Sequence, residues 1–173
     1  MNATVFLLLG TNMGDRNKNL TDTLTAIAKG VGRIRKKSSV YETAAWGKAD
    51  QEPFYNQVIE LETSLHPRQV LHELLAIEQK MGRKRADPWG ERIIDADILF
   101  YGDEIIETDI LIIPHPQLTY RRFTLIPLNE IAPDLIHPIF QKKIFPQNYL
   151  IGSPHVHIDS IQFLYFNYSL RLL

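Results

Sequence analysis

The chain of 173 residues contains no cysteine. Without cysteine there can be no disulfide bond, no thiolate metal site and no cysteine nucleophile. Any chemistry that this protein performs must therefore come from other side chains.

The sequence also lacks a long hydrophobic run. Its first apolar stretch, residues 5–9, is far shorter than the ~20 residues that cross a bilayer. The four residues before it carry no positively charged side chain, which a signal peptide would have. We therefore expect a cytoplasmic protein with no membrane partner.

A charge excess is missing as well, because 19 Lys and Arg residues balance 20 Asp and Glu residues to a net charge of −1. Nucleic-acid surfaces need a basic excess, so we expect no nucleic-acid partner. Any site for an anion must be built from a few local arginines. The length and the hydrophobic content of 45% favour one domain with a substantial core.

The apolar pattern predicts alternating strands and helices. Predicted strands cover residues 5–9, 33–42, 54–62 and 92–100, and predicted helices cover residues 20–31 and 67–82. The order strand–helix–strand–strand–helix–strand is that of a ferredoxin-like α+β sandwich. We expect a mainly antiparallel sheet with the helices packed on one face.

Two aspartates on the last predicted strand are the most informative feature. Because side chains alternate along a strand, Asp95 and Asp97 point to one face, whereas Ile94, Ala96 and Ile98 point to the other. Carboxylates this close repel each other unless a cation lies between them. Mg²⁺ typically takes one or two carboxylates together with waters and substrate phosphates. The pair predicts a magnesium site, with an acidic solvent-exposed strand face as the alternative.

A basic loop, residues 83–92, precedes this strand. Guanidinium groups bind phosphate bidentately and offset its charge. Beside two carboxylates, the loop indicates a polyphosphate held by metal on one side and by arginine on the other. Trp89 in the loop is a candidate lid that excludes water from a reactive phosphate. Taken alone, the loop would be a solvated basic turn.

Further candidates lie on both sides of these segments. Phe54 and Asn56 share one strand face, where a phenyl ring can stack on a flat ligand and an amide can bond to its edge. A core Phe and a strand-end Asn are the simpler explanation. His115 lies between two prolines, and Arg121 follows to extend the phosphate-facing set. Glu78 lies on the apolar stripe of a helix, so it either borders a cleft or pairs with a loop arginine.

The ordered series of motifs resembles one family, the 6-hydroxymethyl-7,8-dihydropterin pyrophosphokinases of the folate pathway. The series runs from residue 5 to about residue 138, roughly four-fifths of the chain. The matching segments are residues 9–15, 40–43, 54–56, 77–83, 89–98, 114–123 and 130–133.

The resemblance implies transfer of the β,γ-pyrophosphoryl group of ATP to the hydroxymethyl oxygen of the pterin, with release of AMP. It also implies two Mg²⁺ ions that are held by Asp95 and Asp97 and bridge the substrates. ATP would be the co-substrate, and the partners would be these small molecules only. We expect the protein to be a monomer or a weak homodimer.

The resemblance assigns roles to individual residues as well. Its catalytic set is Arg83, Arg92, Asp95 and Asp97. Its ATP-binding set is Glu78, Arg85, Trp89, Arg92, Ile98 through its backbone, His115 and Arg121. Its pterin-binding set is Thr43, Trp46, Phe54, Asn56 and Phe123.

Four positions depart from the family's pattern. Ala96 stands where the family usually has a larger aliphatic residue, so we expect looser packing behind the aspartates. Leu75, Ile110 and Ile112 replace a polar residue, an arginine and a threonine that the best-known members direct toward the nucleotide.

The resemblance ends near residue 143, where charged residues also become rare. We expect residues 1–142 to form the pterin pyrophosphokinase domain and residues 143–173 to be an atypical tail rather than a separate domain. Two other functions stay open. One is a non-catalytic nucleotide-binding module of the same fold, and the other is a Mg²⁺-dependent nucleotidyltransferase that would release pyrophosphate instead of AMP.

Overall fold

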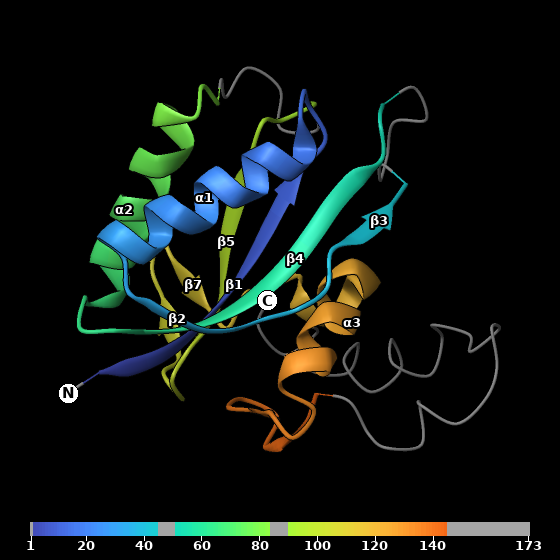
Figure 1. Ribbon diagram of the computed structural model, residues 1–173. Helices are drawn as coiled ribbons and strands as arrows, with labels where there is room; N and C mark the ends of the chain where they lie inside the picture. Colours follow the sequence, from blue (N-terminus) through green and yellow to red (C-terminus); the bar gives the residue numbers. More distant parts are fainter. Residues whose placement is uncertain (1, 45–50, 84–89, 145–173) are drawn as a thin grey trace, which may run out of the picture.

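An antiparallel sheet forms the centre of the computed structural model, which describes residues 2–44, 51–83 and 90–144. In this sheet β1 (Ala3–Thr11) lies between β4 (Phe54–Thr63) and β5 (Asp95–Tyr101) (Figure 1). The strands β2 (Arg33–Lys37) and β3 (Tyr41–Thr43) both pair with β4 on its other side. The strand β5 is therefore an edge strand, and its outer side is open to contacts from helices and loops.

Helices cover both faces of the sheet. On one face lie α1 (Arg16–Gly30) and α2 (Pro67–Lys80), and on the other lies α3 (Arg122–Ile131) (Figure 1). The remaining elements are short: β6 (Ile106–Glu107) with β7 (Ile112–Ile113), β8 (Ile136–His137) with β9 (Lys142–Lys143), and the 3₁₀ helix η1 (Leu118–Tyr120). Each helix within the described ranges is too short or too polar to span a membrane.

The ferredoxin-like α+β sandwich is confirmed, but two details of the expectation are wrong. The predicted strand over residues 33–42 is two strands, and regular pairing with β4 is interrupted after Lys37. At Ser38 the backbone N–H still donates to the carbonyl of Val58 at 2.9 Å, but the side-chain hydroxyl accepts the N–H of Val58 at 3.0 Å. The helices do not all lie on one face, since α3 packs on the opposite side. No helix was predicted over Arg122–Ile131; α3 contains Pro127, and its buried Leu125 and Leu128 have helical spacing.

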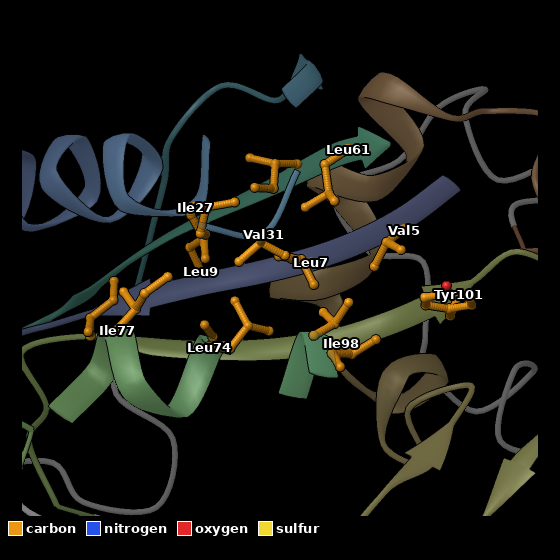
Figure 2. Packing of buried hydrophobic residues seen from close by; sticks show 14 of the residues in the cluster. Val5, Leu7, Leu9, Ile27, Val31, Leu61, Leu74, Ile77, Ile98 and Tyr101 are labelled. Atoms are coloured by element: carbon orange, nitrogen blue, oxygen red, sulfur yellow. The ribbon is translucent and has the colours of Figure 1, made fainter. Parts of the chain in front are cut away.

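Alternation along β1 divides the core into two clusters. Val5, Leu7 and Leu9 point toward α1 and α2, where Leu7 and Leu9 lie near Ile27 of α1 (Figure 2). Phe6 and its neighbour Leu8 point toward α3. The strand is buried on both faces, as its unbroken apolar sequence predicts.

The aspartate-bearing strand is anchored by the same alternation. Ile94, Ala96 and Ile98 are buried in the cluster that faces α1 and α2. Asp95 and Asp97 therefore point to the face that α3 covers. The predicted division of this segment into an apolar anchor and an acidic face is confirmed.

A glycine after α1 provides a test of the packing. A β-carbon at Gly32 would lie 2.2 Å from the backbone carbonyl oxygen of Glu62, so the chain would have to shift. We expect Gly32→Ala to lower the free energy of unfolding by about 1–3 kcal/mol, as overpacked sites do, measured by urea denaturation.

Gly30→Ala is the matched control for this experiment. Its β-carbon would meet only the side chain of Glu73, at 3.7 Å, and alanine favours the helix that Gly30 ends. The control should unfold at the native urea concentration or slightly above it. Equal stability of the two variants would contradict the packing described here.

Candidate functional site

The register of the sheet brings the aspartates to the same face as Asn56. Gly10 of β1 is paired with Asn56 on one side and with Asp95 on the other, and Leu8 is paired with Asp97. Gly10 has no side chain, so the space above it, between the side chains of Asn56 and Asp95, is open. A β-carbon there would lie 3.4 Å from Asn56 Oδ1 and 4.0 Å from Asp95 Cβ.

A cleft of about 220 Å³ opens above Gly10, and we call it the β4-side cleft. Four residues of the predicted pterin-binding set line it together, namely Thr43, Phe54, Asn56 and Phe123. The other lining residues are Leu8, Gly10, Ala44, Gln51, Arg92, Asp95, Asp97 and Arg121. Trp46, the fifth predicted pterin contact, lies outside the described residues.

The amide of Asn56 is held in a fixed orientation at the floor of this cleft. Asn56 is buried, and its Nδ2 donates to the hydroxyl of Thr43 at 2.8 Å. The two residues come from neighbouring strands, since β3 pairs with β4. A buried amide with a fixed donor bond can present its remaining groups to the edge of a ligand ring.

Two aromatic rings and two guanidinium groups share the same cleft. The guanidinium carbon of Arg92 lies 5.9 Å from the ring centre of Phe54, and that of Arg121 lies 5.7 Å from the ring centre of Phe123. Both phenylalanines are half-buried, Phe54 at the start of β4 and Phe123 in the first turn of α3. The cleft therefore suits a flat ring that carries or approaches an anionic group.

A second and larger cleft of about 530 Å³ lies between α2 and the edge strand β5, and we call it the α2-side cleft. Its lining residues are Leu71, Leu75, Glu78, Arg83, Arg92, Asp95, Ala96, Asp97, Ile110, His115 and Arg121. Four side chains line both clefts, namely Arg92, Asp95, Asp97 and Arg121. Asp95 and Asp97, which we call the acidic pair, thus lie where the two clefts meet.

The two carboxylates of the acidic pair have different neighbours. Asp95 is paired with the guanidinium groups of both Arg83 and Arg92. Burial, followed by the negative charge of Asp95, raises the pKa of Asp97 to about 7, although the charge of Arg121 opposes the shift. A divalent cation beside the pair would relieve this repulsion.

The donor set fits a magnesium ion that is completed by substrate oxygens. Across residues 2–44, 51–83 and 90–144, no group of three or more His, Asp and Glu side chains is arranged to hold a metal. Asp95 and Asp97 alone would supply protein ligands, which suits Mg²⁺ because it commonly uses one or two carboxylates with waters and phosphates. A zinc site would need more side-chain ligands than this pair offers.

Glu78 connects α2 to the aspartate strand. This buried carboxylate accepts the backbone N–H of Ala96 at 2.9 Å and is paired with Arg83. Both alternatives from the sequence are therefore found, because Glu78 borders the α2-side cleft and also pairs with a loop arginine. The ion pair holds Arg83 beside Asp95.

His115 faces the α2-side cleft as a neutral ring. Burial, assisted by the nearby charge of Arg121, lowers the pKa of His115 to about 4. Its Nδ1 accepts the backbone N–H of Gln117 at 3.1 Å, so the ring proton is on Nε2. Its own backbone N–H donates to the carbonyl of Leu99 at 3.0 Å, which ties this loop to β5. The ring can therefore donate a hydrogen bond without carrying a charge.

The remaining predicted positions are divided between core, surface and undescribed segments. The side chain of Ile98 is buried in the core and lines neither cleft, so only its backbone is available to a ligand. Arg85 and Trp89 lie outside the described residues. Of the departures from the family pattern, Leu75 and Ile110 line the α2-side cleft, whereas Ile112 is exposed and is not one of its lining residues.

Several lining residues were not predicted, namely Leu8, Gly10, Ala44, Gln51 and Leu71. The alternation of side chains along β1 could have identified the first two lining residues, because Leu8 and Gly10 lie on the same face of that strand. An unbroken apolar strand does not show which of its faces meets a ligand. Ala96 both joins the core and lines the α2-side cleft.

Residues 6–133 match the family described as 7,8-dihydro-6-hydroxymethylpterin-pyrophosphokinase (HPPK). The chain is 44% identical over 142 residues to the 2-amino-4-hydroxy-6-hydroxymethyldihydropteridine pyrophosphokinase of Aquifex aeolicus, covering 82% of this chain and 88% of the relative. It is 41% identical over 133 residues to the protein of the same name from Bacillus subtilis, covering 76% and 80% of the two chains.

Solved structures show the same fold. A solved structure of HPPK-DHPS in complex with substrates superposes with a TM-score of 0.67 at 19% identity, over 83% of this chain and 42% of the other. A Plasmodium falciparum HPPK-DHPS with pteroate also gives 0.67, at 21% identity, over 83% and 41%. The chain thus spans about two-fifths of the length of these larger proteins.

Proposed function

Because the chain belongs to the 7,8-dihydro-6-hydroxymethylpterin-pyrophosphokinase family, we propose that it transfers the pyrophosphoryl group of ATP to the hydroxymethyl group of 6-hydroxymethyl-7,8-dihydropterin. The reaction releases AMP and depends on Mg²⁺. One observation carries the proposal, namely that the acidic pair lines both clefts at once. Residues 1–142 form the catalytic domain in this proposal, and residues 143–173 are a tail rather than a second domain.

ATP binds in the larger, α2-side cleft. Arg83, Arg92 and Arg121 supply three positive charges there, and the Nε2–H of His115 supplies a neutral donor to a phosphate oxygen. The N–H of Ala96 points away from β1 toward Glu78, and Ile98 lies two residues further along the same strand. The backbone of Ile98 therefore faces the same open edge, where it is available to the base.

The pterin binds in the smaller, β4-side cleft. Its flat ring lies between the rings of Phe54 and Phe123, and the amide of Asn56 bonds to its edge. Arg92 and Arg121 lie beside the two phenyl rings and also reach the α2-side cleft. The hydroxymethyl group is thus directed toward Asp95 and Asp97.

The residues of this chain act by holding the two substrates in line. The hydroxymethyl oxygen attacks the β-phosphorus, the bond from that phosphorus to the α,β-bridging oxygen breaks, AMP leaves with that oxygen, and the hydroxyl proton is released to solvent. Bound Mg²⁺ supplies neutralisation of the phosphate charge. The arginines stabilise the charge that develops on the phosphates, and no covalent enzyme intermediate is needed.

Product analysis tests this function directly. The chain is incubated with ATP, Mg²⁺ and 6-hydroxymethyl-7,8-dihydropterin, and the nucleotides are separated. AMP formation that requires the pterin supports the proposal. Free pyrophosphate would instead support a nucleotidyltransferase, and binding without any product would support a non-catalytic nucleotide-binding module.

The acidic pair should be essential for turnover but not for folding. We expect Asp97→Asn to lower kcat by about a hundredfold or more, because it removes a metal ligand at the junction of the clefts. Thermal stability should be unchanged or higher, since the variant removes a carboxylate from beside Asp95. Steady-state kinetics and calorimetry measure the two effects.

Asp103→Asn is the matched control, because Asp103 is an exposed carboxylate in the turn after β5. Its kcat should equal that of the native chain. If Asp97→Asn also kept native activity, the metal assignment would be wrong.

Gly10 should control the size of the β4-side cleft. Gly10→Ala places a methyl group above the sheet at ordinary contact distances from Asn56 and Asp95, so the fold should be retained. We expect pterin affinity to fall by about tenfold or more, because the methyl group occupies ring space, whereas affinity for a non-hydrolysable ATP analogue should stay native. Calorimetric titration measures both, and an equal loss of the two affinities would argue against separate clefts.

A further inference from the structure

We propose that Asn12 is a positioning residue that fixes the starts of β4 and β5 relative to each other, and so aligns the pterin with the phosphates. The inference rests on the proposed function of the two clefts. Asn12 directly follows β1 and is only 2% exposed. Among the residues that the structure describes, it is not one of those that line either cleft. Its action must therefore pass through other residues.

The first partner of Asn12 is the backbone of Arg92. Asn12 Oδ1 accepts the N–H of Arg92 at 2.8 Å, and the backbone N–H of Asn12 donates to the carbonyl of Arg92 at 3.1 Å. Both backbone groups of Arg92 are thus held by one residue. Its side chain pairs with Asp95 and lines both clefts, so the backbone position of Arg92 decides where this guanidinium can reach.

The second partner is the segment that leads into β4. Asn12 Nδ2 donates to the carbonyl of Glu52 at 3.2 Å. Glu52 lies two residues before Phe54, and its neighbour Gln51 lines the β4-side cleft. A single amide group thereby joins the residues before Phe54 to the residues before Asp95.

These two segments do not pair with each other in the sheet, because β1 lies between β4 and β5. The side chain of Asn12 therefore connects the segments before β4 and β5, which the strand pairing of the sheet does not connect to each other. An amide is the suitable group, since one oxygen accepts and one nitrogen donates in the same plane. A carboxylate at this position would keep the bond from Arg92 but would face the carbonyl of Glu52 with a second acceptor.

A change of Asn12 should affect how the two bound substrates are aligned and not the affinity for either substrate. The side chains that contact each substrate remain when Asn12 is changed, so each substrate alone should still bind. The relative placement of the two clefts would loosen, and small displacements of reacting groups are costly for transfer between bound substrates. The effect should appear in kcat and not in the separate dissociation constants.

Two variants of Asn12 test the inference in the full chain. We expect Asn12→Ala to lower kcat by about tenfold or more, while the dissociation constants of an ATP analogue and of the pterin each change by less than about threefold. Asn12→Asp, which keeps the bond to Arg92 but loses the bond to Glu52, should show the same pattern, with kcat lowered and the two dissociation constants little changed. It also serves as the second variant should Asn12→Ala fold poorly. Hydrogen exchange at the amide of Arg92 should accelerate in Asn12→Ala and not in Asn12→Asp.

Asn19→Ala is the matched control. Asn19 Nδ2 donates to the carbonyl of Met13 at 2.8 Å and to the hydroxyl of Thr11 at 3.3 Å, so this amide supports the same turn through partners that lie outside the segments before Phe54 and Asp95. Its kcat should stay within about twofold of native, which separates alignment from general loosening of the turn.

The outcomes distinguish the inference from the proposed function. Native kcat in both Asn12 variants would overturn the role of Asn12, and so would an equal loss of kcat in Asn19→Ala. A loss that appeared only in the dissociation constants would also overturn it. A native chain that makes no AMP from ATP and the pterin would overturn the proposed function itself, and the inference would fail with it.

Discussion

The antiparallel register of β1 with both of its neighbours is the constraint on which the site depends. This register sets Gly10 between Asn56 and Asp95, and it sets Leu8 beside Asp97. A slip of one residue would turn the acidic pair into the core that α1 and α2 cover, because strand side chains alternate between faces. Burial of both faces of β1 makes such a slip costly, since it would expose one apolar cluster and bury charges in the other.

At the junction of the clefts, guanidinium groups and a bound cation would compete for the same carboxylates. Arg83 and Arg92 both pair with Asp95, and Glu78 holds Arg83 from the other side. Phosphate oxygens would draw these guanidinium groups toward the nucleotide, because guanidinium binds phosphate bidentately. The carboxylates would then be left to a cation, which would relieve the repulsion from Asp95 that helps to raise the pKa of Asp97. The same side chains can therefore balance charge both before and after a substrate binds.

Local patterns in the sequence were sufficient for the acidic strand face and for the order of the elements, because both depend on alternation and spacing over a few residues. They were also sufficient to group Phe54 with Asn56, which share a face of β4 and line one cleft. They were not sufficient for α3, which contains an internal proline, or for the roles of Gly10 and Asn12, which arise from partners 40 or more residues away. The assignments of Trp46, Arg85 and Trp89 stay predictions, since these residues lie outside the described ranges.

In the proposed function, the acidic pair joins a pterin cleft to a nucleotide cleft. A crystal structure with Mn²⁺, a non-hydrolysable ATP analogue and the pterin tests this claim most directly, because Mn²⁺ can be located by its anomalous scattering. We expect metal bound to Asp95 and Asp97, the pterin ring between Phe54 and Phe123, and the triphosphate on the α2 side of the pair. Metal bound away from these two carboxylates, or both ligands in one cleft, would contradict it.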